Sequence, residues 1–140
     1  MKLWELKIDD YQQLKEDVHL IRESVFVCEQ NINRAIEFDH QDTYCTHVVL
    51  YHQKKAVGTG RINSIGKIGR VCVLKEYRGK QYGKALMKAL EGHGKDNDCD
   101  QVHLHAQEGV IPFYEKIGYG KEGSIFAEAG ISHQRMAKKF

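Results

Sequence analysis

Three cations and two glycines lie within seven residues, in the segment Arg78-Gly79-Lys80-Gln81-Tyr82-Gly83-Lys84. An apolar run from Val71 to Leu74 precedes this segment, and apolar residues at helical spacing follow it. A turn from a strand into a helix exposes unpaired amides and the positive end of the helix dipole, so it can hold an anion. Glycines let the backbone approach a phosphate closely, and the cations compensate its charge. The segment therefore indicates a phosphate-binding turn, with a solvated basic turn as the alternative.

Histidines and cysteines offer a second kind of chemistry, metal ligation, in the pairs Cys45-x-His47 and His103-x-His105. Alternate residues of a strand share one face for packing reasons alone, so such pairs do not by themselves indicate zinc. No metal site is expected. The four cysteines form no C-x-x-C pair, and the mixed polarity of the first seven residues does not suggest a signal peptide. We therefore expect reduced, mostly buried thiols and a cytoplasmic location.

The elements that must position these residues follow from hydrophobic periodicity. We expect strands at 3–8, 47–51, 56–62, 67–74, 100–106 and 133–138, with a hairpin turn at 52–55. Helices are expected after the caps Asp9 and Asp10, from Tyr82 to about Gly94, and from Pro112 to a stop at Gly118. The polar segment 28–46 indicates a long loop with a short helix. The strands around 67–106 should form a right-handed parallel crossover.

Size and charge limit the possible functions. The 140 residues, with one proline and no Ser/Gly-rich linker, predict a single domain over 1–140. No apolar run is long enough to cross a membrane. A net charge of +2 without a concentrated basic stripe argues against nucleic acid as a partner.

The basic turn resembles motif A of the GCN5-related N-acetyltransferase (GNAT) family, [Q/R]-x-x-G-x-[G/A], with Arg78 first and Gly83 last. Gln81 departs from the motif, because it occupies the position of the first glycine. The segment 102–107 and the helix Phe113-Tyr114-Glu115-Lys116-Ile117-Gly118-Tyr119 resemble the family's motif B, FY-x-K-x-G-[FY]. The resemblance extends from Ala56 onward. The segments 25–30 and 133–136 are similar to the branch of ElaA-like and YjcF-like proteins.

The resemblance implies an α/β GNAT fold, a mixed and mostly antiparallel sheet of six or seven strands with about four helices. Two strands would splay apart to admit coenzyme A. It implies an enzyme that transfers the acetyl group of acetyl-CoA to a primary amine by direct attack on the thioester. Three expected cofactor contacts are the backbone of Val71, Cys72 and Val73 at the pantetheine arm, the residues from Arg78 to Lys84 at the pyrophosphate, and Gln107. Tyr114 matches the tyrosine that protonates the departing thiolate; without the family it would be a core residue.

A lysine-like amine has a pKa near 10.4, so a group that accepts its proton should assist at neutral pH. Glu37, Glu76, Glu108 and His105 are candidates, and the choice between Glu37, His105 and a water relay stays open. The acceptor would be an amine on a small molecule or a protein. Four acids, Glu29, Glu37, Asp39 and Asp42, suggest a cationic acceptor or simply solvated charges. A homodimer remains open. So does the alternative function of a non-catalytic acyl-CoA-binding or regulatory module.

Overall fold

The computed structural model describes residues 3–140, so the first two residues of the amino-terminal stretch lie outside the described residues. Seven strands form one sheet in the order β1-β2-β3-β4-β5-β7-β6. The strands are β1 (Trp4–Asp10), β2 (Cys45–His52), β3 (Lys55–Asn63), β4 (Lys67–Val73), β5 (Gln101–Gln107), β6 (Gly120–Glu128) and β7 (Ile131–Lys139). The helices are α1 (Tyr11–Arg22), α2 (Arg34–Glu37), α3 (Tyr82–Asp96) and α4 (Ile111–Lys116). This mixed α/β fold agrees with the predicted strand and helix numbers.

Local chemistry explains where the main elements begin and end. Asp10 caps α1, its side chain accepting a hydrogen bond from the amide of Gln13 at 3.0 Å. The hairpin between β2 and β3 turns at Gln53 and Lys54, both with positive φ, as the tight turns that match strand twist require. Pro112 lies in the first turn of α4, and Gly118 follows it with φ of 102°. These boundaries confirm the sequence predictions.

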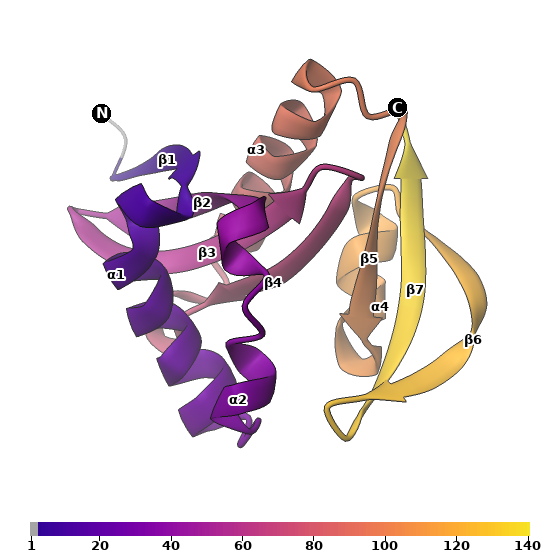
Figure 1. Ribbon diagram of the computed structural model, residues 1–140, viewed down its shortest axis with the longest axis horizontal. Coiled ribbons are helices and arrows are strands. Elements are labelled where there is room, and N and C mark those ends of the chain that lie inside the picture. The colour runs from indigo at the N-terminus through magenta and orange to yellow at the C-terminus, as the bar shows by residue number, and fades with distance from the viewer. Residues whose placement is uncertain (1–2) are drawn as a thin grey trace.

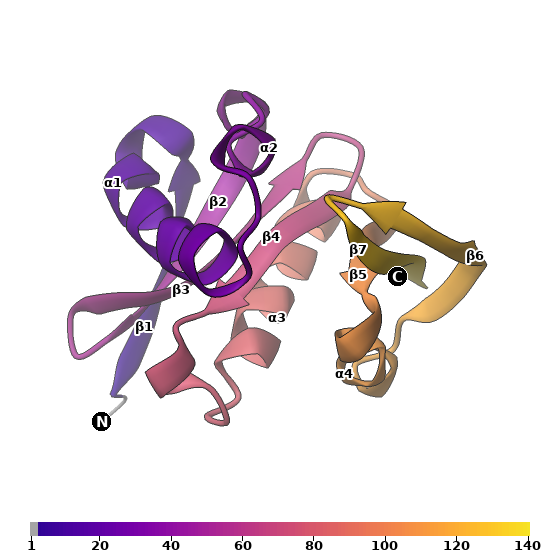
Figure 2. The ribbon, with the colours of Figure 1, turned by 90° about the horizontal axis from the view of Figure 1, so that it is seen from below.

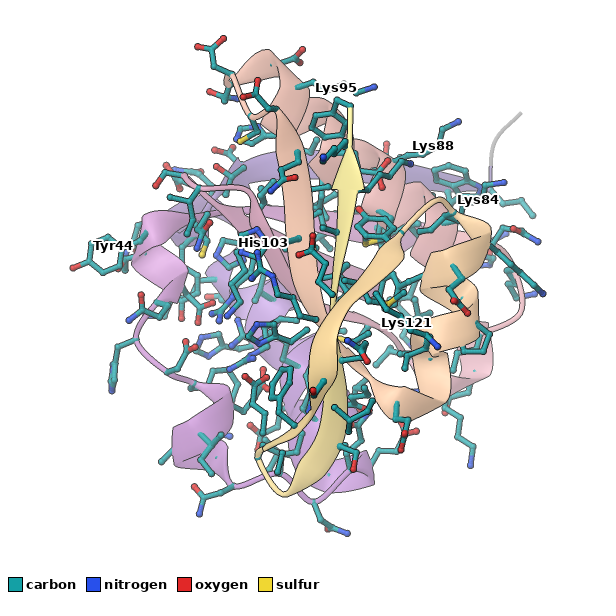
Figure 3. The ribbon with its side chains drawn as sticks, turned by 90° about the vertical axis from the view of Figure 1, so that its right-hand side faces the viewer. Tyr44, Lys84, Lys88, Lys95, His103 and Lys121 are labelled. Atoms are coloured by element: carbon teal, nitrogen blue, oxygen red, sulfur yellow. The ribbon has the colours of Figure 1, made fainter. Side chains whose placement is uncertain are left out.

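The helices cover opposite faces of the sheet. Figure 2 shows α1 and α2 on one face, with α3 and α4 on the other. The residues predicted to form the core-facing side of the first helix are all buried: Leu14, Val18 and Ile21 on α1, and Val25 just beyond its end. On the other face, α3 contributes Leu86 and Leu90 to the larger hydrophobic cluster, while Figure 3 shows Lys84 and Lys88 projecting outward from the same helix.

The sheet divides between β4 and β5, the one parallel pair of strands in the sheet of residues 3–140 (Figure 1). Only two register pairs join them, Lys67 with His103 and Ile68 with Leu104. Beyond Ile68 the strands separate, whereas β4 continues to pair with β3 as far as Val73. The edge of β4 that faces β5 therefore carries backbone groups without a partner on β5. This is the predicted splay.

Three features differ from the expectation. Strand β6 was not predicted, because eight of its nine residues are exposed and show no apolar alternation. The chain after α1 continues as a π-helix, Glu23–Glu29, instead of entering a loop at residue 28. All four cysteines are free thiols, as predicted. However, the expectation that they are mostly buried is wrong, because Cys72 alone is fully buried and Cys28 is exposed.

Candidate functional site

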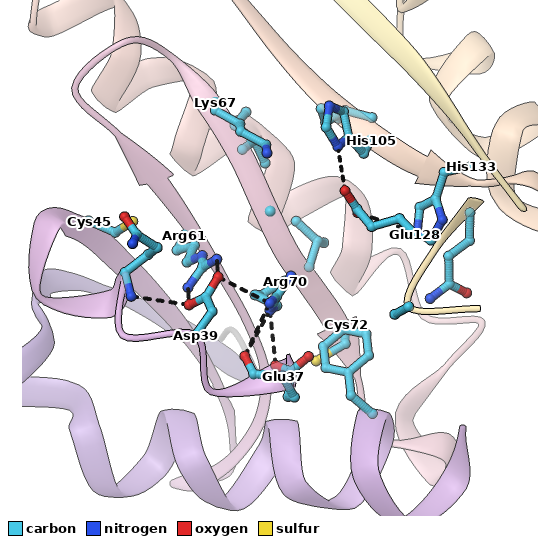
Figure 4. Close-up of a pocket in the computed structure, with 18 of the residues that line it drawn as sticks. Glu37, Asp39, Cys45, Arg61, Lys67, Arg70, Cys72, His105, Glu128 and His133 are labelled. Atoms are coloured by element: carbon cyan, nitrogen blue, oxygen red, sulfur yellow. Dashed lines mark hydrogen bonds and ion pairs between the residues drawn. The ribbon is translucent and has the colours of Figure 1, made fainter. Parts of the chain in front are cut away.

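A cavity of about 990 Å³ opens where β4 and β5 separate (Figure 4). Its walls come from the π-helix, α2, β4, β5, α4 and the turn between β6 and β7. Eight of the predicted site residues line it: Glu37, Val71, Cys72, Val73, Arg78, His105, Gln107 and Tyr114. The remaining ones, Gly79 to Lys84, do not line this cavity and lie beyond Arg78 along the chain. The predicted pantetheine and catalytic residues thus share one space, and the predicted phosphate turn adjoins it.

A β-bulge in β4 lies beside the point of separation. Arg61 pairs with Gly69 and Thr59 pairs with Cys72, so Gly60 alone opposes two residues of β4, Arg70 and Val71. Arg70 takes the extra position with φ of 56°, an uncommon conformation for a residue with a side chain. The extra residue shifts the alternation of side chains along β4 by one position. As a result, Val71 packs on the α3 side of the sheet and Cys72 packs on the α1 side. Bulges bend strands, which here accompanies the departure of β4 from β5.

The turn before α3 carries backbone amides that have no partner in the helix. The first hydrogen bond within the helix joins the amide of Ala85 to the carbonyl of Gln81 at 3.2 Å. The amides of Tyr82, Gly83 and Lys84 therefore precede the helical ladder and have no partner within the helix. The side chains of Lys80 and Lys84 are exposed beside them. This arrangement can hold an anion such as a pyrophosphate.

Gln81, where the family motif has glycine, adopts the left-handed conformation with φ of 68° and ψ of 15°. A glycine would adopt this conformation without strain, and glutamine adopts it at a cost. The backbone before α3 therefore has the conformation that the motif glycine would favour, although glutamine occupies the position. Gly83 has a different role, since a Cβ there would lie 3.3 Å from Cζ of Phe113. The close packing of α3 against α4 leaves little room for a side chain at Gly83.

Two polar contacts connect the end of the π-helix to the two sides of the cleft. Arg78 forms a bidentate ion pair with Glu29, with both N–O distances at 2.7 Å, and also donates to the carbonyl of Val73. The side-chain amide of Gln107, at the end of β5, donates to Gln30 at 2.8 Å. The side chains of Arg78 and Gln107, both predicted to contact the cofactor, are therefore engaged with the π-helix.

Tyr114 projects from α4 into the cavity. The residue is 8% exposed and packs edge-on against Phe113 and Tyr119. Burial raises its pKa above the ordinary value for tyrosine, so the phenol keeps its proton at neutral pH. Within residues 3–140 its hydroxyl has no hydrogen-bond partner, although the cavity beside it is accessible. A protonated phenol that faces a cleft can donate a proton or a hydrogen bond.

Glu37 belongs to a buried cluster of arginines and acids between α1, β3, β4 and α2. Its carboxylate accepts a hydrogen bond from Arg22 at 2.7 Å and lies 3.1 Å from Nε of Arg70. Arg22 is completely buried and also bonds Asp42 at 2.6 Å. Burial raises the pKa of Glu37 above its ordinary value, against the opposing effect of Arg70 and Arg22. The carboxylate lines the cavity, and both guanidinium groups contact the same oxygen, Oε2.

The acids of segment 28–42 do not form the unpaired acidic wall suggested by the sequence. Besides Glu37, Asp42 bonds Arg22 and Arg61, and Asp39 bonds Arg61 in a bidentate pair. Glu29 pairs with Arg78. The negative charge of each acid is thus matched by an arginine, and an attraction for cationic acceptors does not follow from them.

On the opposite wall, His105 lies on β5 with Nδ1 3.0 Å from the carboxylate of Glu128 (Figure 4). Nε2 of His133 lies 3.8 Å from the other oxygen of that carboxylate. The ring of Phe126 packs edge-on against His105 and stacks on His133, with centroid distances of 5.0 and 6.0 Å. Glu128 and His133 were not among the predicted site residues. His133 lies in the segment that is similar to the ElaA-like branch, whereas Glu128 carries no local signal.

Residues 3–140 contain neither a membrane-spanning helix nor a cluster of metal ligands. No helix in that range is long and apolar enough to span a membrane. The same range contains no group of three or more His, Cys, Asp or Glu side chains arranged to hold a metal ion.

Comparison with known proteins gives consistent results. The model of the acetyltransferase (GNAT) domain matches residues 9–140. The uncharacterized N-acetyltransferase YjcF of Bacillus subtilis is 41% identical over 131 residues, covering 91% of this chain and 93% of YjcF. The crystal structure of Escherichia coli ElaA superimposes with a TM-score of 0.84 at 27% identity, over 97% of this chain and 99% of ElaA. A Lactobacillus plantarum protein assigned as an N-acetyltransferase gives a TM-score of 0.91 at 28% identity, over 99% of both chains.

Proposed function

Because the chain belongs to the GNAT family of acetyltransferases, we propose that it transfers an acetyl group to a primary amine by direct attack of the amine on the thioester. It is an acyl-CoA-dependent N-acetyltransferase, and acetyl-CoA is the acetyl donor that enzymes of this family use. The observation that carries the proposal is the cavity between the separated strands β4 and β5, which adjoins the unpaired amides of α3. The acceptor is a primary amine on a small molecule or a protein.

The residues present fit coenzyme A. The amides of Tyr82, Gly83 and Lys84 lie at a positive helix end, where a pyrophosphate would be held, and Lys80 and Lys84 add charge. The edge of β4 from Val71 to Val73 has backbone groups free of β5, which suits the amides of a pantetheine arm. When bound, acetyl-CoA supplies the acetyl group as a thioester.

Within the cavity, Tyr114 would supply a proton or a hydrogen bond to the thiolate that leaves. Its support is the buried position, the raised pKa and the hydroxyl without a partner among residues 3–140. An amide near Val73 would stabilise the negative charge that develops on the acyl oxygen. Removal of one such donor typically costs about 3–4 kcal/mol.

The amine must lose a proton, and Glu37, His105 or a water molecule would accept it. Glu37 and His105 line opposite walls of the cavity, so either could reach an acceptor there. We also propose that residues 1–140 act as one domain, which the match over 9–140 supports. The free cysteines suit a reducing compartment such as the cytoplasm.

Acetyl-CoA, a panel of primary amines and a thiol-release readout test this proposal. We expect CoA release that depends on the amine and a melting temperature that rises with CoA, because a ligand of the folded state stabilises it. A melting temperature unchanged at high CoA excess would contradict the cofactor site. Stabilisation by CoA without any acetyl transfer would instead favour the binding-module alternative.

A further inference from the structure

The cavity wall formed by β5, β6 and β7 carries a hydrogen-bonded pair, His105 and Glu128, and family membership assigns no function to this pair. His105 lies on the cavity face of β5, and its Nδ1 is 3.0 Å from the carboxylate of Glu128. Glu128 is the last residue of β6, directly before the turn Ala129-Gly130, so this turn brings the carboxylate to His105. His133, on β7, lies 3.8 Å from the second oxygen. Three strands thus meet at one carboxylate.

The hydrogen bond determines which imidazole nitrogen is available. If Nδ1–H donates to Glu128, the proton of the neutral ring is on Nδ1 and Nε2 keeps a free lone pair. A carboxylate that accepts from one nitrogen fixes the orientation and tautomer of the ring and stabilises its protonated form. The His105 side chain is 23% exposed, so it remains accessible from the cavity.

The surroundings keep Glu128 ionised. Burial opposes ionisation, but the hydrogen bond to His105 and the charges of His105, His133 and Lys67 outweigh it, so the pKa of Glu128 lies below its ordinary value. Phe126 packs against both imidazoles and limits their movement. Glu37, on the opposite wall, lies beside the guanidinium groups of Arg22 and Arg70, which both contact its Oε2. Within residues 3–140, no hydrogen bond or ion pair engages Nε2 of His105, so this nitrogen can accept a proton.

We propose that Glu128 is a positioning residue that holds His105 so that Nε2 accepts a proton from the ammonium group of the acceptor. In this step the N–H bond of the ammonium breaks and an Nε2–H bond forms, giving a neutral amine and an imidazolium. The carboxylate of Glu128 compensates the imidazolium charge, and solvent later takes the proton. This inference rests on the proposed amine acetylation and assigns its proton acceptor.

Several charged or titratable groups surround His105 and can affect how kcat/KM depends on pH. They are Lys67 on β4, His103 on β5 itself, Glu128 on β6, and His133 and Arg135 on β7. Burial and the nearby charges of Arg135 and Lys67 lower the pKa of His103, so this histidine is neutral at pH 7. Arg135 is paired with Glu122 at 3.0 Å.

The test compares Glu128→Gln with Glu122→Gln. Glu122 is on the same strand, is similarly exposed and pairs with Arg135 instead of His105, so it is a matched control. The pH dependence of kcat/KM is measured for both variants, for His105→Asn and for the wild type. The tautomer of the neutral His105 ring is determined by ¹⁵N NMR in the wild type and in both glutamate variants, independently of activity.

We expect Glu128→Gln to lower kcat/KM about 10- to 100-fold at pH 7 and to shift the acid limb to lower pH, because the imidazolium loses its counter-charge. The neutral His105 ring should carry its proton on Nδ1 in the wild type and in Glu122→Gln, and this preference should be lost in Glu128→Gln. His105→Asn should remove the acid limb. An active wild type whose Glu128→Gln variant matches Glu122→Gln in both measurements would overturn the positioning role. A wild type that acetylates no amine would instead overturn the proposed function.

Discussion

Gly83 provides the sharpest test of the cofactor site. It lies in the first turn of α3, where an added Cβ would be 3.3 Å from Cζ and 3.5 Å from Cε1 of Phe113. Carbon atoms at optimal separation lie about 3.5–4.0 Å apart, so even alanine requires a small shift of the Phe113 ring. Valine adds two further methyl groups and should displace the first turn. The amides that would hold the pyrophosphate would move with it.

The expected loss follows from the hydrogen bonds at stake. A hydrogen bond to a charged group contributes about 1.5–3 kcal/mol, and two misplaced amides would cost about 3–6 kcal/mol of binding free energy. This corresponds to CoA affinity about 10²–10⁴-fold weaker in Gly83→Val. Gly83→Ala should show a smaller loss.

Gln81→Gly is the matched change at the neighbouring position. The left-handed conformation costs a residue with a side chain about 1–2 kcal/mol, and glycine at position 81 would remove this strain. Glycine also has more conformational freedom to lose on folding, which offsets about 0.5–1 kcal/mol of the gain in stability. We therefore expect slightly higher stability, with CoA affinity at least equal to that of the wild type. Calorimetric titration with CoA and thermal unfolding of both variants measure these effects. Wild-type affinity in a folded Gly83→Val protein, with loss of binding in Gln81→Gly, would refute the placement of the cofactor.

Three further predictions concern the cavity and the buried charges. Tyr114→Phe should lower kcat about 10²-fold with little change in CoA affinity, because it removes a proton donor but keeps the ring; an unchanged kcat with a good acceptor would exclude the acid role. Arg22→Met should lower the free energy of unfolding by about 3–5 kcal/mol in urea titrations, because Glu37 and Asp42 lose a buried partner; a loss below about 1 kcal/mol would argue against the cluster. Burial lowers the pKa of His47, so the unfolded chain binds more protons below about pH 6.5 and stability should fall from pH 7 to pH 5. His47→Gln should reduce this dependence, and an equal pH dependence in both proteins would contradict it.

Local patterns in the sequence predicted most of the fold. The α1 face, the β2–β3 hairpin and the start of α4 each depend on neighbouring residues whose spacing or turn preference is visible in the chain. Strand β6 could not be predicted in this way. It is an exposed edge strand, contains Gly123 with φ of 74°, and pairs irregularly with β7 between Glu122 and Phe126. Its strand conformation depends on pairing with β7 and not on its own residues.

The parts of the candidate site that lie in local sequence motifs could be predicted. The parts that depend on contacts between residues far apart in the chain could not. Motifs A and B predict roles for the glycines and cations before α3 and for Tyr114, and the structure places Tyr114 on the cavity. The partners of Glu37 could not be predicted in this way, because Arg22 lies 15 residues earlier and Arg70 lies 33 residues later, on β4. Glu128 reaches His105 from 23 residues away, through the unpredicted strand. The same long-range pairing explains why the acids of segment 28–42 resemble a charged wall in the sequence but are compensated in the fold.

The most direct test of the central claim is a crystal structure of the protein with CoA. We predict density for the pantetheine arm between the backbone of Val71–Val73 and β5, and for the pyrophosphate at the amides of Tyr82, Gly83 and Lys84. Density for CoA at any other surface, with the separation between β4 and β5 filled by side chains, would contradict this account.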